Sequence, residues 1–314
     1  MDSLVKKQKW ERIKNKTRRF FPFYIMALPG IAYLIINNYI PMTGITIAFR
    51  QYTVRGGLFN SKWIGLKNFE FLFRSSDSWI ITRNTILYNF GFIILGTFIS
   101  VVTAICLNEI KKKFFARFYQ TVILLPHLIS MVVVSYIAYA FLSSTTGFLN
   151  SSVLKTLGID PIFWYSEQKY WPFILTFVSI WTRFGFSAII YYASIVGIDT
   201  QLFEAAAVDG ASRFRQIVSI TLPSLKPTII IMTILAIGRI FYADFGLFYQ
   251  VPQNSGALFP VTNVIDTYVY RALINQNNIG MSSAANFYQS VIGFVLVITT
   301  NSIVRRIDRE NALY

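Results

Sequence analysis

Long apolar runs dominate the chain and are separated by shorter polar, basic or aromatic stretches. A helix needs about 20 predominantly apolar residues to cross a bilayer, so each long run is a candidate transmembrane helix. The candidate spans are residues 22–48, 84–107, 118–142, 171–197, 227–249 and 287–304. In the first, Pro22, Pro29 and Gly30 predict a kink, which packing against neighbouring helices would tolerate. The pattern predicts an all-α membrane protein with six transmembrane helices.

A different pattern lies between the fourth and fifth runs, in the stretch EAAAVDGASRFRQIVSITLP from Glu204 to Pro223. Asp199 or Thr200 is placed to cap a short helix over 201–208, which the dipeptide Asp209-Gly210 then ends.

Beyond this bend, Phe214, Ile217, Val218 and Leu222 recur at helical spacing on one side. Pro223 and Pro227 are expected to stop that helix and begin the next span. The stretch therefore predicts a bent pair of cytoplasmic helices. Its small residues Ala205–Ala207 would allow close approach of another protein, although an interfacial helix lying on lipid fits the same pattern.

Composition agrees with a membrane protein, because 54% of the residues are hydrophobic and only 14% are charged. The net charge of +15 does not require a nucleic-acid partner, since cytoplasmic loops of membrane proteins collect Lys and Arg. Of the 29 Lys and Arg residues, 18 fall in the tails and the loops after the second and fourth spans, and nine in the alternate loops. This bias places both termini and the Glu204–Pro223 stretch in the cytoplasm.

No repeat or flexible linker divides the chain, so residues 1–314 are expected to form one transmembrane domain with a basic cytoplasmic tail at 1–21. The tail leads into a run that is too long and too interrupted for a cleavable signal peptide, which predicts an uncleaved first span.

The sequence offers little that could perform catalysis. Cys106 is the only cysteine and is expected to be a small buried hydrophobe, so neither a disulfide nor a four-cysteine zinc site can form within the chain. His127 is the only histidine, and a helix-packing role is favoured over a substrate contact. There is no phosphate-binding GxxxxGK[ST] loop and no HExxH or GxSxG motif. The chain is therefore expected to bind no metal or cofactor and not to be an enzyme.

Ionisable side chains at bilayer depth are costly, so they mark candidate substrate contacts. Ser179, Arg183 and Ser187 repeat at four-residue spacing on the fourth span, and Arg239 and Tyr242 are expected to share a face of the fifth. With Asp244, they give the candidate substrate site Ser179, Arg183, Arg239, Tyr242 and Asp244. The alternative is an internal ion pair, for instance between Asp244 and Arg183, that holds two spans together.

The Glu204–Pro223 stretch resembles the cytoplasmic signature of ABC importer permeases: Glu-Ala-Ala, three residues, Gly, nine residues, Ile, one residue, Leu-Pro. The matching positions are Glu204, Ala205, Ala206, Gly210, Ile220, Leu222 and Pro223, all at the signature's spacing. The stretches WIGLKNFEFLF from Trp63, ILLPHLIS, and VIDTYVYRALINQNNIGMSSAANFYQSVIGFV are similar to parts of carbohydrate-uptake permeases, especially the branch of LplB-type oligosaccharide permeases.

This resemblance implies a type I ABC importer permease fold in a bacterial plasma (inner) membrane. It also implies a second homologous permease, two cytoplasmic ATPases that bind ATP and magnesium, and an extracellular solute-binding protein as partners. The coupling loop, residues 199–226, would seat in a cleft of the ATPase. Glu204 would pair with a basic residue there, Ala205 and Ala206 would allow close approach, and Gly210 would provide the bend; Asp209, Ile220, Leu222 and Pro223 complete the coupling set.

The expected function is therefore the membrane subunit of an ATP-driven importer of an oligosaccharide or related sugar. A permease for peptides or amino acids is the nearest alternative, and an ion-coupled carrier that acts alone is a further one.

Overall fold

The computed structural model describes residues 20–53, 55–75 and 77–308. A first apolar helical segment, Phe20–Phe49, includes α2 (Ile40–Met42). The longer helices that follow are α5 (Ser78–Asn108), α6 (Lys113–Leu128), α7 (Met131–Leu142), α8 (Trp171–Val196), α11 (Leu222–Ile237), α13 (Ile265–Gln276) and α14 (Ile279–Ile307). The shorter elements are α3 (Gly57–Asn60), α4 (Phe71–Arg74), α9 (Thr200–Val208), α10 (Arg213–Gln216), α12 (Phe259–Thr262) and an antiparallel pair of strands, β1 (Arg50–Gln51) and β2 (Lys62–Trp63).

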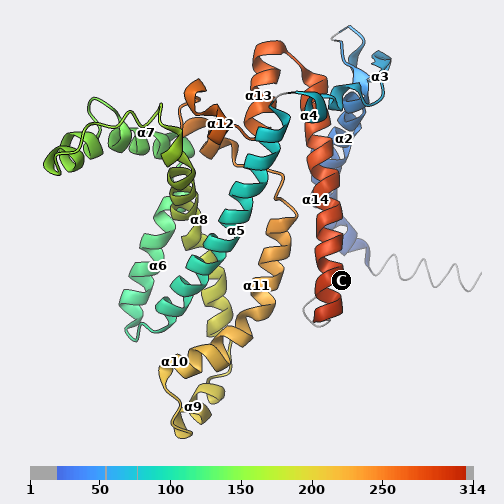
Figure 1. Ribbon diagram of the computed structural model, residues 1–314. Coiled ribbons are helices and arrows are strands. Elements are labelled where there is room, and N and C mark those ends of the chain that lie inside the picture. Colours follow the sequence, from blue (N-terminus) through green and yellow to red (C-terminus); the bar gives the residue numbers. More distant parts are fainter. Residues whose placement is uncertain (1–19, 54, 76, 309–314) are drawn as a thin grey trace, which may run out of the picture.

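The long helices form a bundle in which α5 packs along α8 and α14 stands beside the first segment (Figure 1). The short helices α9 and α10 project from one end of this bundle, whereas α12 and α13 lie toward the other end (Figure 1). Helix α14 ends on the side from which α9 and α10 project (Figure 1). Within the described residues, five helices are long and apolar enough to cross a membrane, or six if the bent pair α6–α7 counts as one span. The prediction of a helical membrane protein is confirmed.

The third expected span, residues 118–142, is wrong as a single straight helix, because α6 and α7 meet at an angle of 94°. Ile129 and Ser130 both adopt extended backbone conformations between the two helices. The Ser130 hydroxyl then caps α7 by accepting the backbone N–H of Val133 at 3.4 Å. The apolar run correctly predicted helical structure, but the run divides into two helices at Ser130, which caps the second.

The fifth expected span, residues 227–249, is also displaced. One continuous helical segment runs from Arg213 to Ile237, so Pro223 and Pro227 neither stop a helix nor begin one. The segment ends at Gly238, and residues 238–244 form turns and irregular backbone. Arg239, Tyr242 and Asp244 consequently lie on this break, and not on one face of a transmembrane helix.

Helical segments accommodate several of their prolines through wider turns. The π-helical turns Ile35–Tyr39, Ile217–Thr221 and Gly246–Gln250 each lie just before a proline, namely Pro41, Pro223 and Pro252. A proline ring clashes with the carbonyl four residues earlier in a regular α-helix. A π turn displaces that carbonyl, which explains how the helix through Pro223 stays continuous.

The buried apolar residues lie between helices and not all around each of them. One cluster joins α8 to the segment 246–251 through Trp171, Leu175 and Leu247, and another joins α5, α8 and α11 through Ala104, Tyr191 and Leu225. In contrast, none of the most apolar window of Phe20–Phe49 is buried by the rest of the chain. Cys106 is likewise exposed, so the expectation of a buried cysteine is wrong, although its neighbours Ala104 and Leu107 are buried.

The closest approach of α6 to α8 depends on a glycine. A Cβ atom at Gly185 would lie 1.8 Å from the backbone carbonyl oxygen of Ile123, so only a residue without a side chain fits between the two helices. His127 on α6 adds to this contact, because its Nδ1 lies 3.2 Å from the Thr182 carbonyl and its ring stacks on Phe186 at 4.9 Å. This arrangement fits the predicted helix-packing role of His127.

Substituting Gly185→Ala is expected to force α6 and α8 apart and to lower the free energy of unfolding by about 1–3 kcal/mol. Thermal unfolding of the detergent-solubilised protein measures the effect. Gly91→Ala on α5 is the matched control, since nothing lies within 4 Å of a Cβ added there. Equal melting temperatures for the two variants would contradict the tight α6–α8 contact.

Candidate functional site

A cavity of about 470 Å³ lies between α5, α8, α11 and the break at residues 238–244. Helix α5 supplies residues from Asn89 to Ser100, α8 supplies residues from Ser179 to Tyr191, and Met232 and Ala236 come from α11. This volume is within the range of small-molecule sites, about 300–1,000 Å³. The polar side chains in its wall include Asn89, Thr97, Ser100, Ser179, Arg183, Ser187, Arg239, Tyr242 and Asp244.

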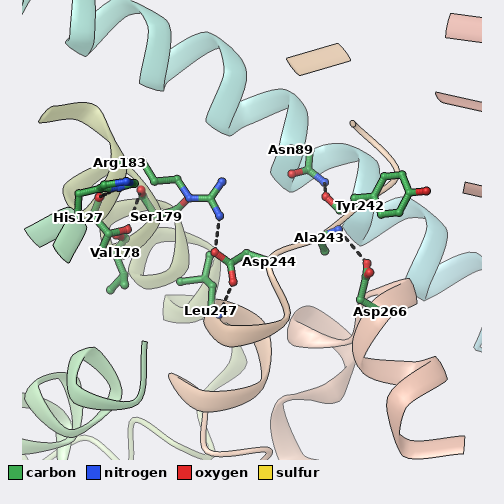
Figure 2. A network of polar contacts seen from close by, with 11 residues as sticks. Asn89, His127, Val178, Ser179, Arg183, Tyr242, Ala243, Asp244, Leu247 and Asp266 are labelled. Carbon is green, nitrogen blue, oxygen red and sulfur yellow. Dashed lines mark hydrogen bonds and ion pairs between the residues drawn. The ribbon is translucent and has the colours of Figure 1, made fainter. Parts of the chain in front are cut away.

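The break is held in place by side chains from three helices. Asn89 of α5 donates from its amide to the carbonyls of Ile240 and Tyr242 at 2.8 and 3.2 Å (Figure 2). Gln289 of α14 donates to the Phe241 carbonyl at 2.7 Å. These donors replace the hydrogen bonds that the helix no longer makes, as non-helical backbone at membrane depth requires.

Asp266, in the first turn of α13, completes this set. Its carboxylate accepts the backbone N–H of Ala243 at 2.8 Å and the side-chain amide of Gln289 at 3.2 Å. Figure 2 shows Asp266 on the opposite side of Ala243 from Asp244, and it does not belong to the cavity wall. Asp266 therefore fixes the break from behind while Tyr242 and Asp244 face the cavity.

Close backbone contact fixes the start of the break against α14. A Cβ at Gly293 would lie 2.4 Å from the Gly238 carbonyl oxygen, and one at Gly238 would lie 2.4 Å from a methyl carbon of Val297. Tyr242 adds a hydrogen bond between its hydroxyl and that of Ser290, at 2.7 Å. Asn89, Gln289 and Gly293 all lie near the middle of their helices, so the break lies near the middle of the bundle's long axis.

Arg183 and Asp244 form an ion pair between α8 and the break (Figure 2). The second carboxylate oxygen of Asp244 accepts the backbone N–H of Leu247 at 3.1 Å, which caps the following turn. The alternative reading of these two residues as an internal ion pair is thus observed. Both side chains nevertheless remain in the cavity wall, where the arginine side chain is 51% exposed.

Arg239 is in a different situation. Its side chain is exposed at the cavity wall and makes no ion pair with any residue in the described part of the chain. Among the described residues, the cavity wall thus contains two guanidinium groups and one carboxylate.

The structure brings together all the candidate substrate residues, Ser179, Arg183, Arg239, Tyr242 and Asp244, in the wall of one cavity. Ser187 joins them, as its spacing on α8 predicts, whereas His127 does not line the cavity. The sequence reasoning missed Asn89, Asp266 and Gln289, which shape the site from other helices. The available signal was a polar amide or carboxyl group inside or beside an apolar run.

The coupling loop also adopts the predicted local structure at its first helix. The Asp199 carboxylate caps α9 by accepting the backbone N–H of Gln201 at 2.9 Å. Gly210 ends the helix with φ of +75°, a left-handed conformation that favours glycine. Ser212 then caps α10 by accepting the N–H of Arg215 at 3.3 Å, so a bend separates α9 from the long segment Arg213–Ile237.

The bend exposes apolar side chains at the end of the bundle. Val208 is 89% exposed and Phe214 is 77% exposed, and Leu202 is also exposed. Glu204, Ala205, Asp209, Gly210, Leu222 and Pro223 are exposed as well, while Ala206 and Ile220 are half-buried. The coupling set therefore forms an accessible surface that no other part of the described chain covers.

A polar cluster closes the opposite end of the bundle. Arg271 of α13 donates to Asn254 Oδ1 at 2.9 Å and to the Asn263 side chain, and its guanidinium lies 4.2 Å from the centre of the Phe259 ring. Burial lowers the pKa of Arg271, but an arginine stays cationic. The cluster ties the 251–264 connection to α13, which carries Asp266.

Comparison with known proteins adds independent information. Residues 93–309 match the family described as binding-protein-dependent transport system inner membrane component. The chain is 33% identical to the polygalacturonan/rhamnogalacturonan transport system permease protein YteP of Bacillus subtilis, with 98% of this chain and 95% of that protein covered. It is also 32% identical to protein LplB of Bacillus subtilis, with 91% and 89% covered. Among solved structures, a chain of the bacterial alginate ABC transporter, in complex with alginate pentasaccharide-bound periplasmic protein, is similar with a TM-score of 0.84 and 30% identity, over 94% of this chain and 98% of that one.

Asp266→Ala is expected to leave the backbone N–H of Ala243 without its acceptor and to lower the free energy of unfolding by about 1–3 kcal/mol. Asp266→Asn retains a carbonyl oxygen at this position and should keep most of the stability. Thermal unfolding in detergent compares these variants with Asp160→Ala, a substitution at an exposed position far from the break. If Asp266→Ala has the same melting temperature as the wild type, Asp266 does not stabilise the break.

Proposed function

The chain belongs to the family of binding-protein-dependent transport system inner membrane components, and on that premise we propose that it carries an oligosaccharide across the membrane through the cavity beside the break. The main observation that supports this proposal is that polar side chains from α8 and from the break line one central cavity. The similar proteins named for polygalacturonan/rhamnogalacturonan and alginate support a saccharide over a peptide or amino acid. Hydroxyl and amide side chains in the wall suit sugar hydroxyls, and the ring of Tyr242 suits stacking on a sugar.

The proposal includes one transmembrane domain with six passes, in which α6 and α7 together make the third. Both termini lie in the cytoplasm, as the distribution of Lys and Arg indicates. The end of α14 on the side of α9 and α10 supports this orientation (Figure 1).

The energy for transport comes from separate subunits. The sequence has no phosphate-binding loop of its own, so ATP and magnesium are bound by two partner ATPases, and a second permease completes the membrane part. The exposed surface around Val208 and Phe214, with Glu204 beside it, is the docking site for an ATPase. Apolar area of this kind at the end of a bundle favours a protein partner.

A rigid helix connects this docking site to the cavity. The segment Arg213–Ile237 has 25 residues and runs without interruption from the coupling bend to the break. At 1.5 Å per residue it spans about 37 Å, which exceeds the hydrocarbon thickness of about 30 Å. Movement of the coupling bend by the ATPase is therefore transmitted along the helix to Gly238 and the adjoining cavity residues.

Substitution at Gly210 tests the coupling role. Gly210→Val places a β-branched residue at a φ of +75°, and strain of about 1–3 kcal/mol should displace the bend and lower ATP-dependent uptake by about fivefold or more. Gly210→Asn is the matched control, because asparagine tolerates this conformation better. Uptake by proteoliposomes and co-purification of the ATPase are measured together. Wild-type uptake and ATPase association in Gly210→Val would show that the bend is not the coupling element.

Reconstitution tests the transport function itself. Proteoliposomes with both permeases, the ATPases and the binding protein should accumulate an oligosaccharide only when ATP is present, and not a dipeptide or an amino acid. The same chain alone should transport none of them. Transport by the isolated chain without ATP would instead establish an ion-coupled carrier.

A further inference from the structure

The charges in the cavity do not balance. Arg183 is neutralised by its ion pair with Asp244, whereas Arg239 makes no ion pair within the described residues. Among the residues that the structure describes, no other charged side chain lines the cavity. One guanidinium is thus exposed to the cavity without a counter-charge in its wall.

The position of Arg239 makes this imbalance informative. The residue directly follows Gly238, which is in close contact with Gly293 near the middle of α14. A lone arginine near the centre of a bilayer is costly by every available measure, so such residues pair with another group or mark a substrate pathway. The described part of the chain supplies no acidic partner for Arg239, so a substrate pathway is the reading that this position favours.

The guanidinium group limits what this partner can be. An arginine remains charged at any physiological pH and presents a planar fork of N–H donors that matches a carboxylate or a phosphate. Neutral sugar hydroxyls form weaker hydrogen bonds with it than anionic oxygens do. The other polar groups around it, such as Ser179 and Asn89, are uncharged and suit hydroxyls.

We infer that the cavity selects an anionic saccharide, and that Arg239 is the specificity-determining residue that binds its carboxylate or phosphate group. This inference rests on the proposed function of the cavity in saccharide transport. The guanidinium of Arg183 is already paired with Asp244, so only Arg239 is available to bind an anionic group of the saccharide. Tyr242 also lines the cavity, and its hydroxyl is hydrogen-bonded to that of Ser290.

Asp266 does not remove the imbalance. Its carboxylate accepts hydrogen bonds from Ala243 and Gln289 behind the break and does not line the cavity. An acidic residue of the second permease is the competing source of negative charge. In that case Arg239 would contribute to assembly of the two permeases and not to the choice of cargo.

The test uses the complete transporter in proteoliposomes with its binding protein. The cargoes are an oligogalacturonate, the same oligomer with its carboxylates methyl-esterified, and a phosphorylated oligosaccharide, each first titrated against the binding protein by calorimetry. Wild type is compared with Arg239→Gln and Arg239→Lys, and Arg74→Gln on the outer surface is the matched control, because Arg74 is 77% exposed. Co-purification of the second permease is measured for every variant.

The expected result is that Arg239→Gln lowers uptake of an anionic cargo by about 10- to 100-fold. Arg239→Lys should retain more of this uptake than Arg239→Gln, and Arg74→Gln should retain the wild-type uptake. Uptake of the oligogalacturonate identifies a carboxylate as the bound group, and uptake of the phosphorylated oligosaccharide identifies a phosphate. If the binding protein also binds the methyl ester, uptake of this ester should change by less than about threefold in Arg239→Gln. The two substitutions at Arg239 should leave co-purification of the second permease as in wild type.

Three results would overturn the inference. The first is that the binding protein binds, and the transporter takes up, only uncharged saccharides. The second is that Arg239→Gln lowers uptake of the charged oligomer and of its ester by the same factor. The third is that the second permease no longer co-purifies with Arg239→Gln. In each of the first two, ATP-dependent saccharide uptake by the wild type would leave the proposed function intact. Absence of ATP-dependent uptake of any saccharide would refute the proposed function instead.

Discussion

The candidate site depends on satisfying the backbone polar groups where the helix ends at Gly238, in the middle of an apolar bundle. Unpaired backbone groups at this depth would each cost several kcal/mol, so irregular backbone survives only with protein partners. Asn89, Gln289 and Asp266 supply those partners from α5, α14 and α13. The same hydrogen bonds that remove this cost also direct Arg239, Tyr242 and Asp244 toward the cavity.

The helix that precedes the break connects it to the bend at Gly210. A regular helix is stiff along its axis, and the π turn before Pro223 preserves its continuity where a proline would otherwise interrupt it. The bend at Gly210 and the cavity therefore lie at the two ends of one continuous helical segment. In the proposed function, the task of this chain is to convert a displacement at Gly210 into a rearrangement near Gly238.

Polar interactions in the cavity have two different roles. The pair between Arg183 and Asp244 joins α8 to the break, and the cap that Asp244 gives to Leu247 fixes the start of the next turn. Arg239 has neither function within the described chain, since it is directed to the cavity without an ionic partner. Under our inference, the Arg183–Asp244 pair has a structural role and Arg239 has a selective one, a difference that the sequence alone did not reveal.

The sequence by itself determined the features that depend on neighbouring residues. Apolar run length predicted a helical membrane protein, Asp199 predicted the cap of α9, and Gly210 predicted the left-handed bend. It also singled out Arg183, Arg239 and Asp244, the charged residues that line the cavity in the described part of the chain. The structure was needed to show where the helices break: α6 and α7 meet at 94°, and the helix through Pro223 continues to Ile237. It alone revealed Asn89, Asp266 and Gln289 as partners of the break, because hydrogen bonds between residues far apart in sequence leave no local periodic signal.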